Sequence, residues 1–188
     1  ISVGTERGVT VARLVTPKVK SVMRDIFGCD SLLGAELENQ PTSSGACWGS
    51  HWEQRLMASE LMAATTSHTA VYSALTLAAL EDSGWYVANF TLAEPLLWGR
   101  LQGCSFVTGQ CVTPSDGTAL STTPESFCTT SSQQSCTVDY RAKAACNVRP
   151  TLTRALSFRC PVACLIWRVL HLADRLLRLE LARVIPVL

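Results

Sequence analysis

The chain of 188 residues has no block of like charge. Its 16 lysines and arginines nearly balance 15 aspartates and glutamates, which leaves a formal net charge of +1. A protein that binds nucleic acid or an anionic surface through its charge needs a basic patch or run. The composition therefore predicts no nucleic-acid partner, and electrostatics indicates no other partner.

A Cys-x-x-Cys pair is also absent, although the chain has nine cysteines. Such pairs are typical of zinc ribbons and thioredoxin-type redox centres. Many scattered cysteines in a chain of this length favour disulfides, and disulfides favour an oxidising, secreted or cell-surface location. Because the count is odd, one thiol is expected to lack a partner within the chain.

The chain begins at Ile1 without an initiator methionine and without the basic, apolar and small-residue succession of a secretory signal. A disulfide-rich protein needs such a signal to reach its compartment. We therefore expect the sequence to be the remainder of a longer protein.

Three helices are predicted before residue 100. The first runs from about Pro17 to Phe27, with Thr16 as the cap and Gly28 as a left-handed end. Its apolar residues fall on one face: Val19, Val22, Met23, Ile26 and Phe27.

The second helix is predicted from about Thr69 to Asp82, where Ser83-Gly84 stops it. A third, shorter helix is indicated by Thr91-x-x-Glu94, which has the form of a capping box ahead of Leu96, Leu97 and Trp98. Pro95 limits how regular this last turn can be.

The composition changes near Cys111. About half of the residues from Thr113 to Thr137 are Ser or Thr, so we expect a loop-rich region that depends on its disulfides and has at most short strands.

The final segment, residues 165–188, has its charged and polar residues on one helical face and is predicted to be an amphipathic helix. Its charges exclude a simple membrane span and break the apolar run that a lipid-anchor signal needs. The segment could lie on a membrane or partner, pack on the core, or derive from a shifted reading frame.

The chain also lacks His-Glu-x-x-His, the motif with which many zinc proteases bind their metal. It does contain the run Gly49-Ser50-His51-Trp52-Glu53, and Met62 follows His51 by eleven positions. Together with blocks at 34–40, 75–90, 93–100 and 103–108, this run resembles the leishmanolysin family, the major surface metalloproteases of trypanosomatid parasites. The resemblance covers about residues 17–147.

The resemblance implies an α+β fold. Residues 1–110 would form a mainly helical metzincin C-terminal subdomain that carries the third zinc ligand and the Met-turn. Residues 111–164 would form a truncated, disulfide-rich and loop-dominated domain, followed by a divergent helical tail at 165–188.

The resemblance also implies residue roles. A lone histidine is more often structural than metal-binding, but the family pattern makes His51 the third zinc ligand. Met62 matches the methionine beneath the metal, with Met57 as the alternative, and a plain core role is the simpler interpretation of Met62. Glu53 is not expected to be the general base, because that residue is the glutamate of His-Glu-x-x-His.

In the complete enzyme, the resemblance implies that zinc-bound water attacks the peptide carbonyl of protein or peptide substrates, with association to a membrane as in the family. His68 and His171 belong to no ligand motif, so this chain supplies one ligand of three. A catalytic zinc needs three protein ligands and an open position. We therefore expect that the chain alone neither holds zinc tightly nor cleaves peptides.

Further features concern the secreted location. The order of the cysteines in the family implies the pairs Cys29–Cys104 and Cys128–Cys146, with partners for Cys111 and Cys136 further along. Cys47, Cys160 and Cys164 remain unassigned. Asn89-Phe90-Thr91 is a glycosylation sequon.

Two functions from different classes remain open. The first is a partial or degenerate zinc metalloendopeptidase. The second is a non-catalytic secreted or surface module that keeps the scaffold for adhesion or binding.

Overall fold

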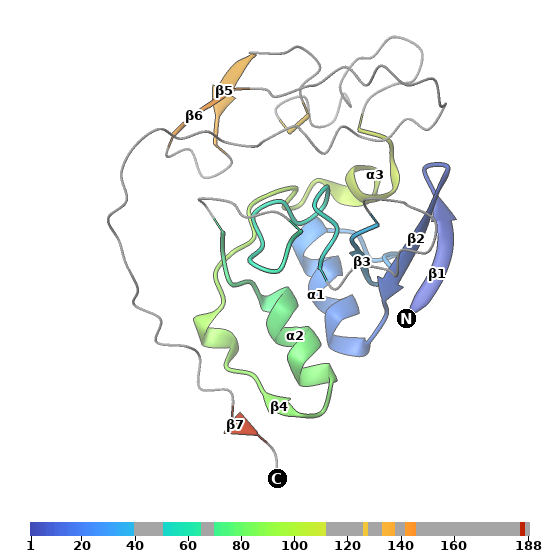
Figure 1. Cartoon of the computed structure of the whole chain (residues 1–188), viewed down its shortest axis with the longest axis vertical. Helices are drawn as coiled ribbons and strands as arrows, with labels where there is room; N and C mark the ends of the chain where they lie inside the picture. The colour runs from blue at the N-terminus through green and yellow to red at the C-terminus, as the bar shows by residue number, and fades with distance from the viewer. Residues whose placement is uncertain are drawn as a thin grey trace.

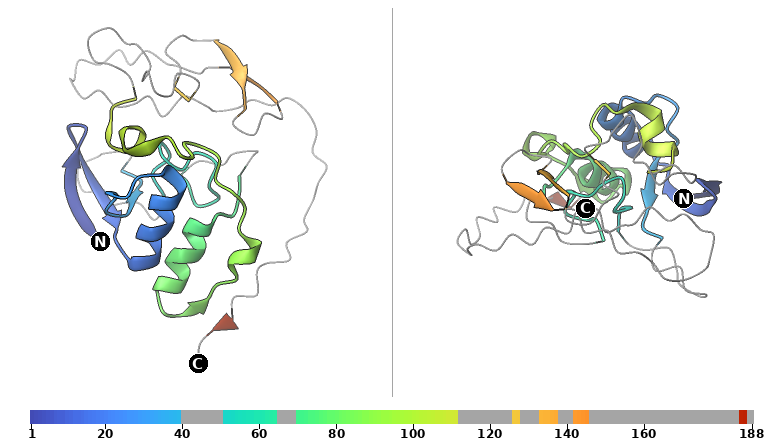
Figure 2. Two further views of the ribbon diagram at one scale, coloured as in Figure 1. Left: turned by 180° about the vertical axis from the view of Figure 1, so that it is seen from behind. Right: turned by 90° about the horizontal axis from the view of Figure 1, so that it is seen from above.

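The structure, a computed structural model, describes residues 1–39, 51–64, 70–111, 126–127, 133–137, 142–145 and 185–186. A β-hairpin at the N-terminus lies beside the helix α1, and a second helix, α2, runs next to α1 on its other side in Figures 1 and 2. The segment at 51–64 packs into the core with both helices, and the short helix α3 lies against α1 (Figure 1).

The hairpin consists of β1 (Ser2–Glu6) and β2 (Val9–Leu14), which pair antiparallel across a tight turn. Both turn residues, Arg7 and Gly8, have positive φ, as the right-handed twist of a two-residue hairpin requires. β3 (Ala35–Leu37) pairs with the other edge of β2, so the sheet has the order β1-β2-β3. This sheet was not predicted, because Arg-Gly lacks the signal that Asn-Gly or Asp-Gly gives for a hairpin turn.

The first predicted helix is confirmed as α1 (Pro17–Phe27). Its apolar face enters the core, since Val19, Met23, Ile26 and Phe27 are buried. Gly28 ends it in the left-handed conformation, with its N–H donating to the carbonyl of Arg24.

The cap of α1 differs from the prediction. Thr16 occupies the N-cap position but its side chain caps nothing. The carboxylate of Asp82 instead accepts hydrogen bonds from the N–H groups of Lys18 at 2.9 Å and Val19 at 3.1 Å. A residue distant in sequence thus satisfies the free donors at the start of the helix, which ties the two helices together.

Asp82 is the last residue of α2 (Ala74–Asp82), which starts later than the predicted Thr69. Ser73 is its N-cap and accepts a hydrogen bond from the N–H of Leu75. The helix is followed by β4 (Tyr86–Val87).

The predicted third helix is wrong. A single 3-10 turn, η1 (Phe90–Leu92), is capped by Asn89, and Glu94 forms an isolated parallel bridge with Ser73. Pro95 restricts Glu94 to extended backbone, which removes the helical position that the capping box needs.

A disulfide fastens α3 (Gly103–Thr108) to the end of α1, since Cys29 is bonded to Cys104. This is the pair that the family resemblance implies. Cys111, just beyond α3, is also disulfide-bonded, whereas Cys136 has a free, exposed thiol and lacks the partner that was expected. Cys128 and Cys146 lie outside the described residues.

Four aromatic rings fill the core between α1 and α3. Phe106 stacks with Phe27 at 5.8 Å and with Phe127 at 5.4 Å between ring centroids, and Trp98 meets Phe106 and Phe127 edge-on. Gly99 follows Trp98 with a φ of +67°, and a Cβ placed there would overlap the rings of Phe106 and Phe27. Only glycine therefore fits at this position.

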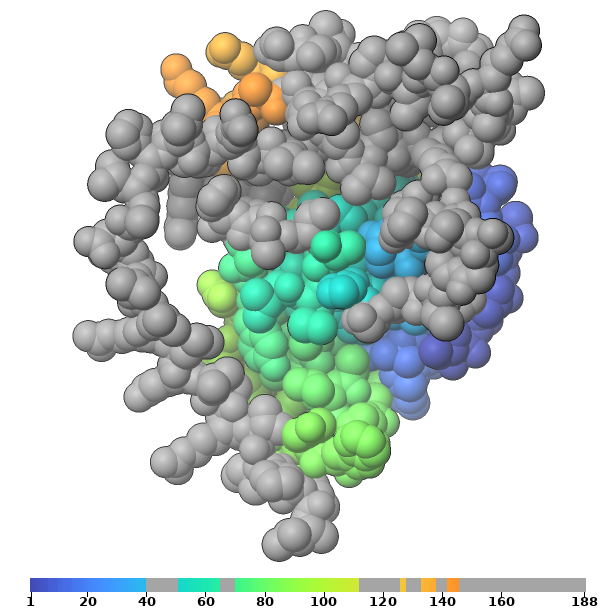
Figure 3. Space-filling model, in the orientation of Figure 1, coloured from blue at the N-terminus to red at the C-terminus, as the bar shows by residue number. Residues whose placement is uncertain are grey.

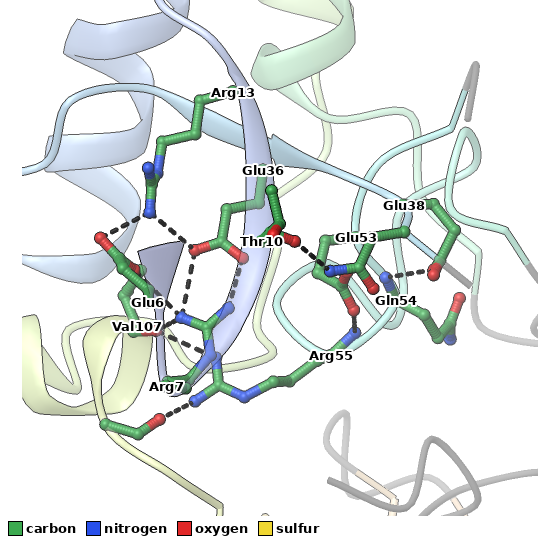
Figure 4. Close-up of polar contacts among 12 residues, drawn as sticks. Glu6, Arg7, Thr10, Arg13, Glu36, Glu38, Glu53, Gln54, Arg55 and Val107 are labelled. Carbon is green, nitrogen blue, oxygen red and sulfur yellow. Dashed lines mark hydrogen bonds and ion pairs between the residues drawn. The ribbon is translucent and has the colours of Figure 1, made fainter. Parts of the chain in front are cut away.

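A cluster of charged side chains is buried between the sheet and α3 (Figure 4). Arg7 reaches back from the hairpin turn and binds both carboxylate oxygens of Glu36, at 3.2 and 2.5 Å, and the carbonyl of Val107 at 2.7 Å. Arg13 pairs with Glu6 at 2.5 Å. Two-pronged arginine–carboxylate pairs hold their geometry firmly, so the hairpin is fixed against the core.

Arg55 makes the second connection within this cluster. Its buried guanidinium donates to the carbonyls of Phe106 at 2.7 Å, Val107 at 3.1 Å and Gly109 at 2.6 Å, and to Sγ of Cys111 at 3.0 Å. It also lies over the rings of Phe106 and Phe127. Burial, followed by the positive charge of Arg7, lowers the pKa of Arg55 to about 10. The segment at 51–64 is thereby attached to the end of α3.

The later part of the chain contains short strands, as predicted. β5 (Gln134–Cys136) and β6 (Lys143–Ala145) form an antiparallel pair. In the segment expected to be helical, β7 (Ile185–Pro186) pairs with β4. A proline cannot donate the backbone bond that a helix interior needs, which explains this local difference. The rest of that segment lies outside the described residues.

The described residues form a mixture of helices and small sheets, as expected in outline, although the N-terminal part is less helical than expected. Among the described residues, no helix has the length and apolar character needed to cross a membrane.

Gly99→Ala is expected to destabilise the protein more than Gly84→Ala. Both glycines have positive φ, but a Cβ at Gly84 meets nothing within 4 Å. Gly84→Ala should cost about 1 kcal/mol through its backbone conformation alone, and Gly99→Ala should cost about 1–3 kcal/mol more through overpacking. Urea unfolding measures the difference, and equal costs would contradict the packing of Phe106 against Gly99.

Stability is expected to fall as the pH rises through the titration of Glu53. Burial, and then the charge of Glu38, raise the pKa of Glu53 from 4.5 to about 7. The folded protein therefore keeps a proton that the unfolded chain has already released, so the stabilisation is complete below pH 4.5 and is lost as the pH passes about 7. The shift corresponds to a loss of about 3 kcal/mol.

Glu53→Gln keeps the shape of the protonated side chain and should remove this loss. Unfolding in urea at about pH 5 and about pH 8 should show the variant equal to the parent at the lower pH and more stable at the higher one. Glu94→Gln, at an exposed glutamate, is the control and should follow the parent. A Glu53→Gln variant that follows the parent at both pH values would refute the assignment.

Candidate metal centre

The segment that begins at His51 extends the sheet beside β3. The N–H of Glu38 donates to the carbonyl of His51 at 2.9 Å, and the N–H of Glu53 donates to the carbonyl of Glu36 at 3.0 Å. Trp52 lies between them and forms an antiparallel bridge with Leu37. The main chain at His51 is therefore held by backbone pairing, while the residue itself is exposed.

The two ends of the same segment pair with each other, because the backbone at Met62 lies beside the backbone at Trp52. The N–H of Trp52 donates to the carbonyl of Met62 at 3.0 Å, and Trp52 forms a parallel bridge with Ala63. His51 and Met62, which the sequence separates by eleven positions, thus lie on neighbouring stretches of backbone. Atoms of the segment at 51–64, coloured teal, are exposed on the face shown in Figure 3.

The two candidate methionines have different environments. Met57 is fully buried in the core next to Leu56, whereas Met62 is 40% exposed. The loop between His51 and Met62 is built from turns, in which the N–H groups of Leu56 and Met57 donate to the carbonyl of Glu53. Met57 thus anchors the loop, and Met62 is the methionine that remains at the surface near His51.

Glu53, the acidic neighbour of His51, is buried. Its carboxylate accepts the N–H of Arg55 at 3.2 Å and lies beside Glu38 in the charged cluster of Figure 4. A general base must reach the substrate. A carboxylate that is 5% exposed within the protein interior does not offer that access.

Glu60 was not singled out from the sequence. Its carboxylate is 1% exposed and accepts the N–H of Met62 at 2.5 Å. Burial, and then the charge of Glu60, raise the pKa of nearby Tyr72. The signal that could have identified Glu60 is its position two residues before the predicted turn methionine, because short loops need acceptors for their free N–H groups.

The donors in the described part of the chain do not fit a complete zinc site. No group of three or more His, Cys, Asp or Glu side chains able to hold a metal occurs among those residues. His51 is a single imidazole, while a catalytic zinc takes three protein ligands. His68 and His171 lie outside the described residues.

The glycosylation sequon lies on the surface. Asn89 is exposed, and its Oδ1 accepts hydrogen bonds from the N–H of Thr91 at 3.1 Å and from its hydroxyl at 2.7 Å. The amide and the hydroxyl that define the sequon are thus in direct contact.

Comparison with known proteins gives a coherent result. The model of the leishmanolysin family matches residues 2–156. A leishmanolysin-like peptidase of Drosophila pseudoobscura is 40% identical over 145 residues, which are 73% of this chain and 21% of the relative.

Two further relatives agree. A leishmanolysin-like peptidase of Caenorhabditis elegans is 49% identical over 98 residues, 52% of this chain and 14% of the relative. The leishmanolysin of Leishmania major is 36% identical over 126 residues, 66% of this chain and 20% of the relative. The chain spans about a fifth or less of the length of these relatives.

The family match extends over most of the chain and includes both β-strands of the hairpin, the three helices and the segment from His51 to Met62. The family is one of zinc metalloproteases. This protein therefore belongs to the leishmanolysin family.

Proposed function

We propose that this chain is the part of a leishmanolysin-like zinc metalloendopeptidase that lies behind the metal, and that His51 is one of three zinc ligands. One observation carries the proposal: the backbone pairing of Trp52 with Met62 brings the two family positions together at an exposed surface. The other two ligands and the general base would come from a His-Glu-x-x-His segment outside this sequence.

The residues of this chain have distinct tasks in that arrangement. His51 would present its imidazole from a segment whose main chain pairs with β3 on one side and with the backbone of Met62 and Ala63 on the other. Met62 offers a polarisable thioether that packs without coordinating. A bound zinc would lower the pKa of a water molecule and polarise the peptide carbonyl, and the substrates would be proteins or peptides.

The same proposal covers location. A disulfide between Cys29 and Cys104 and an exposed sequon at Asn89 suit a secreted or cell-surface protein. Membrane association would follow the family.

A second candidate is a non-catalytic adhesion or binding module on the same scaffold. It is favoured by apolar side chains that are exposed around β4 and η1, among them Trp85, Val87 and Leu92. A patch of exposed apolar side chains is typical of a surface that binds a partner.

The chain alone is expected to bind zinc weakly and to leave casein intact, because one imidazole cannot replace three ligands and the general base. Calorimetry with zinc and a casein digest test this. Tight one-to-one binding with turnover would show that the chain is a complete enzyme by itself.

A chimera tests the role of His51 directly. The matched segment of this chain would replace its counterpart in the leishmanolysin-like peptidase of Drosophila pseudoobscura, and bound zinc and casein cleavage would be measured. His51→Ala should lower zinc affinity at least about a hundredfold, since even the loss of an outer-shell partner costs up to that much.

His68→Ala in the same chimera is the matched control and should keep both zinc and activity. If His51→Ala keeps them as well, His51 is not a ligand, and the adhesion module becomes the better interpretation.

A further inference from the structure

The carboxylate of Glu60 is buried in the loop between His51 and α2, where its hydrogen-bond partners are uncharged. Glu60 is fully enclosed, and both of its oxygens accept hydrogen bonds. Oε2 accepts the N–H of Met62 at 2.5 Å. Oε1 accepts the hydroxyl of Thr76 at 2.6 Å, the hydroxyl of Ser73 at 3.0 Å and the N–H of Ser73 at 3.4 Å.

These partners are N–H and O–H donors without charge. Enclosing a carboxylate costs free energy unless several donors satisfy it, and hydrogen bonds to a charged group are stronger than neutral ones. A buried carboxylate with all of its hydrogen bonds satisfied makes the surrounding structure rigid, so it is expected where a fixed geometry is needed.

The hydroxyl of Thr76 extends the contact to Trp52, the residue after the candidate ligand. It donates to Glu60 and accepts the indole N–H of Trp52 at 2.9 Å. The main-chain N–H of Trp52, in turn, donates to the carbonyl of Met62. Glu60 therefore holds Met62 through one oxygen and Trp52, the neighbour of His51, through the other.

The connection also reaches the helix. Ser73 is the N-cap of α2, and Thr76 lies in the first turn of that helix. Glu60 forms a parallel bridge with Val71, and the N–H of Val71 donates to the carbonyl of Ser59 at 2.8 Å. The carboxylate thus fixes the loop to a rigid element rather than to another loop.

We propose that Glu60 is a positioning residue that keeps the backbone at His51 and Trp52 in register with the turn of Met62, a role that rests on the proposed metal-binding function. It acts through its hydrogen bonds to Met62, Ser73 and Thr76 and would not itself bind a metal.

The chemistry of the side chain suggests a discriminating variant. Glutamine has the shape of glutamate but only one acceptor oxygen, and its NH2 group can only donate. In Glu60→Gln, the amide oxygen can face the N–H of Met62 or the N–H of Ser73, but not both. If it faces Ser73, the N–H of Met62 loses its acceptor; if it faces Met62, the N–H of Ser73 loses its acceptor and the hydroxyls of Thr76 and Ser73 must accept instead of donate. Either way, the hydrogen bonds to a charged carboxylate are lost.

The experiment uses the full chain without metal, labelled with ¹⁵N, and follows hydrogen exchange of the Trp52 amide, which donates to Met62. Glu60→Gln should speed this exchange at least about tenfold, because a hydrogen bond to a charged group is lost, and should move the Met62 amide resonance upfield. The amide of Gly28, which donates to Arg24, should be unaffected. Glu94→Gln is the matched control and should change neither signal.

Two threonine variants keep the test decisive if Glu60→Gln does not fold. Thr76→Val removes the hydroxyl and should move the indole N–H resonance of Trp52 upfield and speed exchange of its amide, and Thr76→Ser should restore both. A purely packing role of Thr76 would make serine, which lacks the methyl group, no better than valine. Unchanged Trp52 exchange in Glu60→Gln, or failure of serine to rescue, would overturn the proposal.

The outcome is independent of the test of His51. If the chimera shows that His51 is not a ligand, the response of the Trp52 amide to Glu60→Gln is unaltered, and only the proposed function fails. If the amide does not respond while His51→Ala loses zinc, only the positioning role fails.

Discussion

The structure depends on buried arginine and glutamate side chains, each of which must be paired or hydrogen-bonded within the core. The core encloses the side chains of Arg7, Glu36 and Arg55 together with its aromatic rings. Each charged group is tolerated only because hydrogen bonds replace the water that it has lost. Arg7 and Glu36 join the hairpin to β3, and Arg55 joins the segment after His51 to the end of α3. Without these pairs, the segment that begins at His51 would have no fixed β3 edge to pair with.

The sequence predicted those parts whose signals are local. The helix from Pro17 to Phe27 was found at its observed bounds because an N1 proline, an apolar face and a terminal glycine all indicated the same segment. The approximate position of α2 followed in the same way. By contrast, the cap of α1 by Asp82 joins residues far apart in the chain, and no local pattern contains that information.

In the candidate site, too, the sequence predicted the local features but not the contacts between residues that are distant in the chain. The positions of His51 and Met62 came from the family pattern, but no pattern indicated that the carbonyl of Met62 accepts the N–H of Trp52. Glu60, Thr76 and Arg55 were missed because glutamate, threonine and arginine are mostly surface residues, so their types predicted exposure. These polar groups are buried within the segment that the leishmanolysin family model matches, where they hold the loop from His51 to Met62 in a fixed shape.

The covalent link between Cys29 and Cys104 closes a ring of main chain that contains β3, the loop from His51 to Met62, and α2. Any single break of the backbone within that ring leaves both pieces attached to each other through sulfur. A protein of this kind can therefore be nicked in a protease-rich environment and still keep the elements around His51 assembled, and the two pieces would separate only after a reductant had opened the bond.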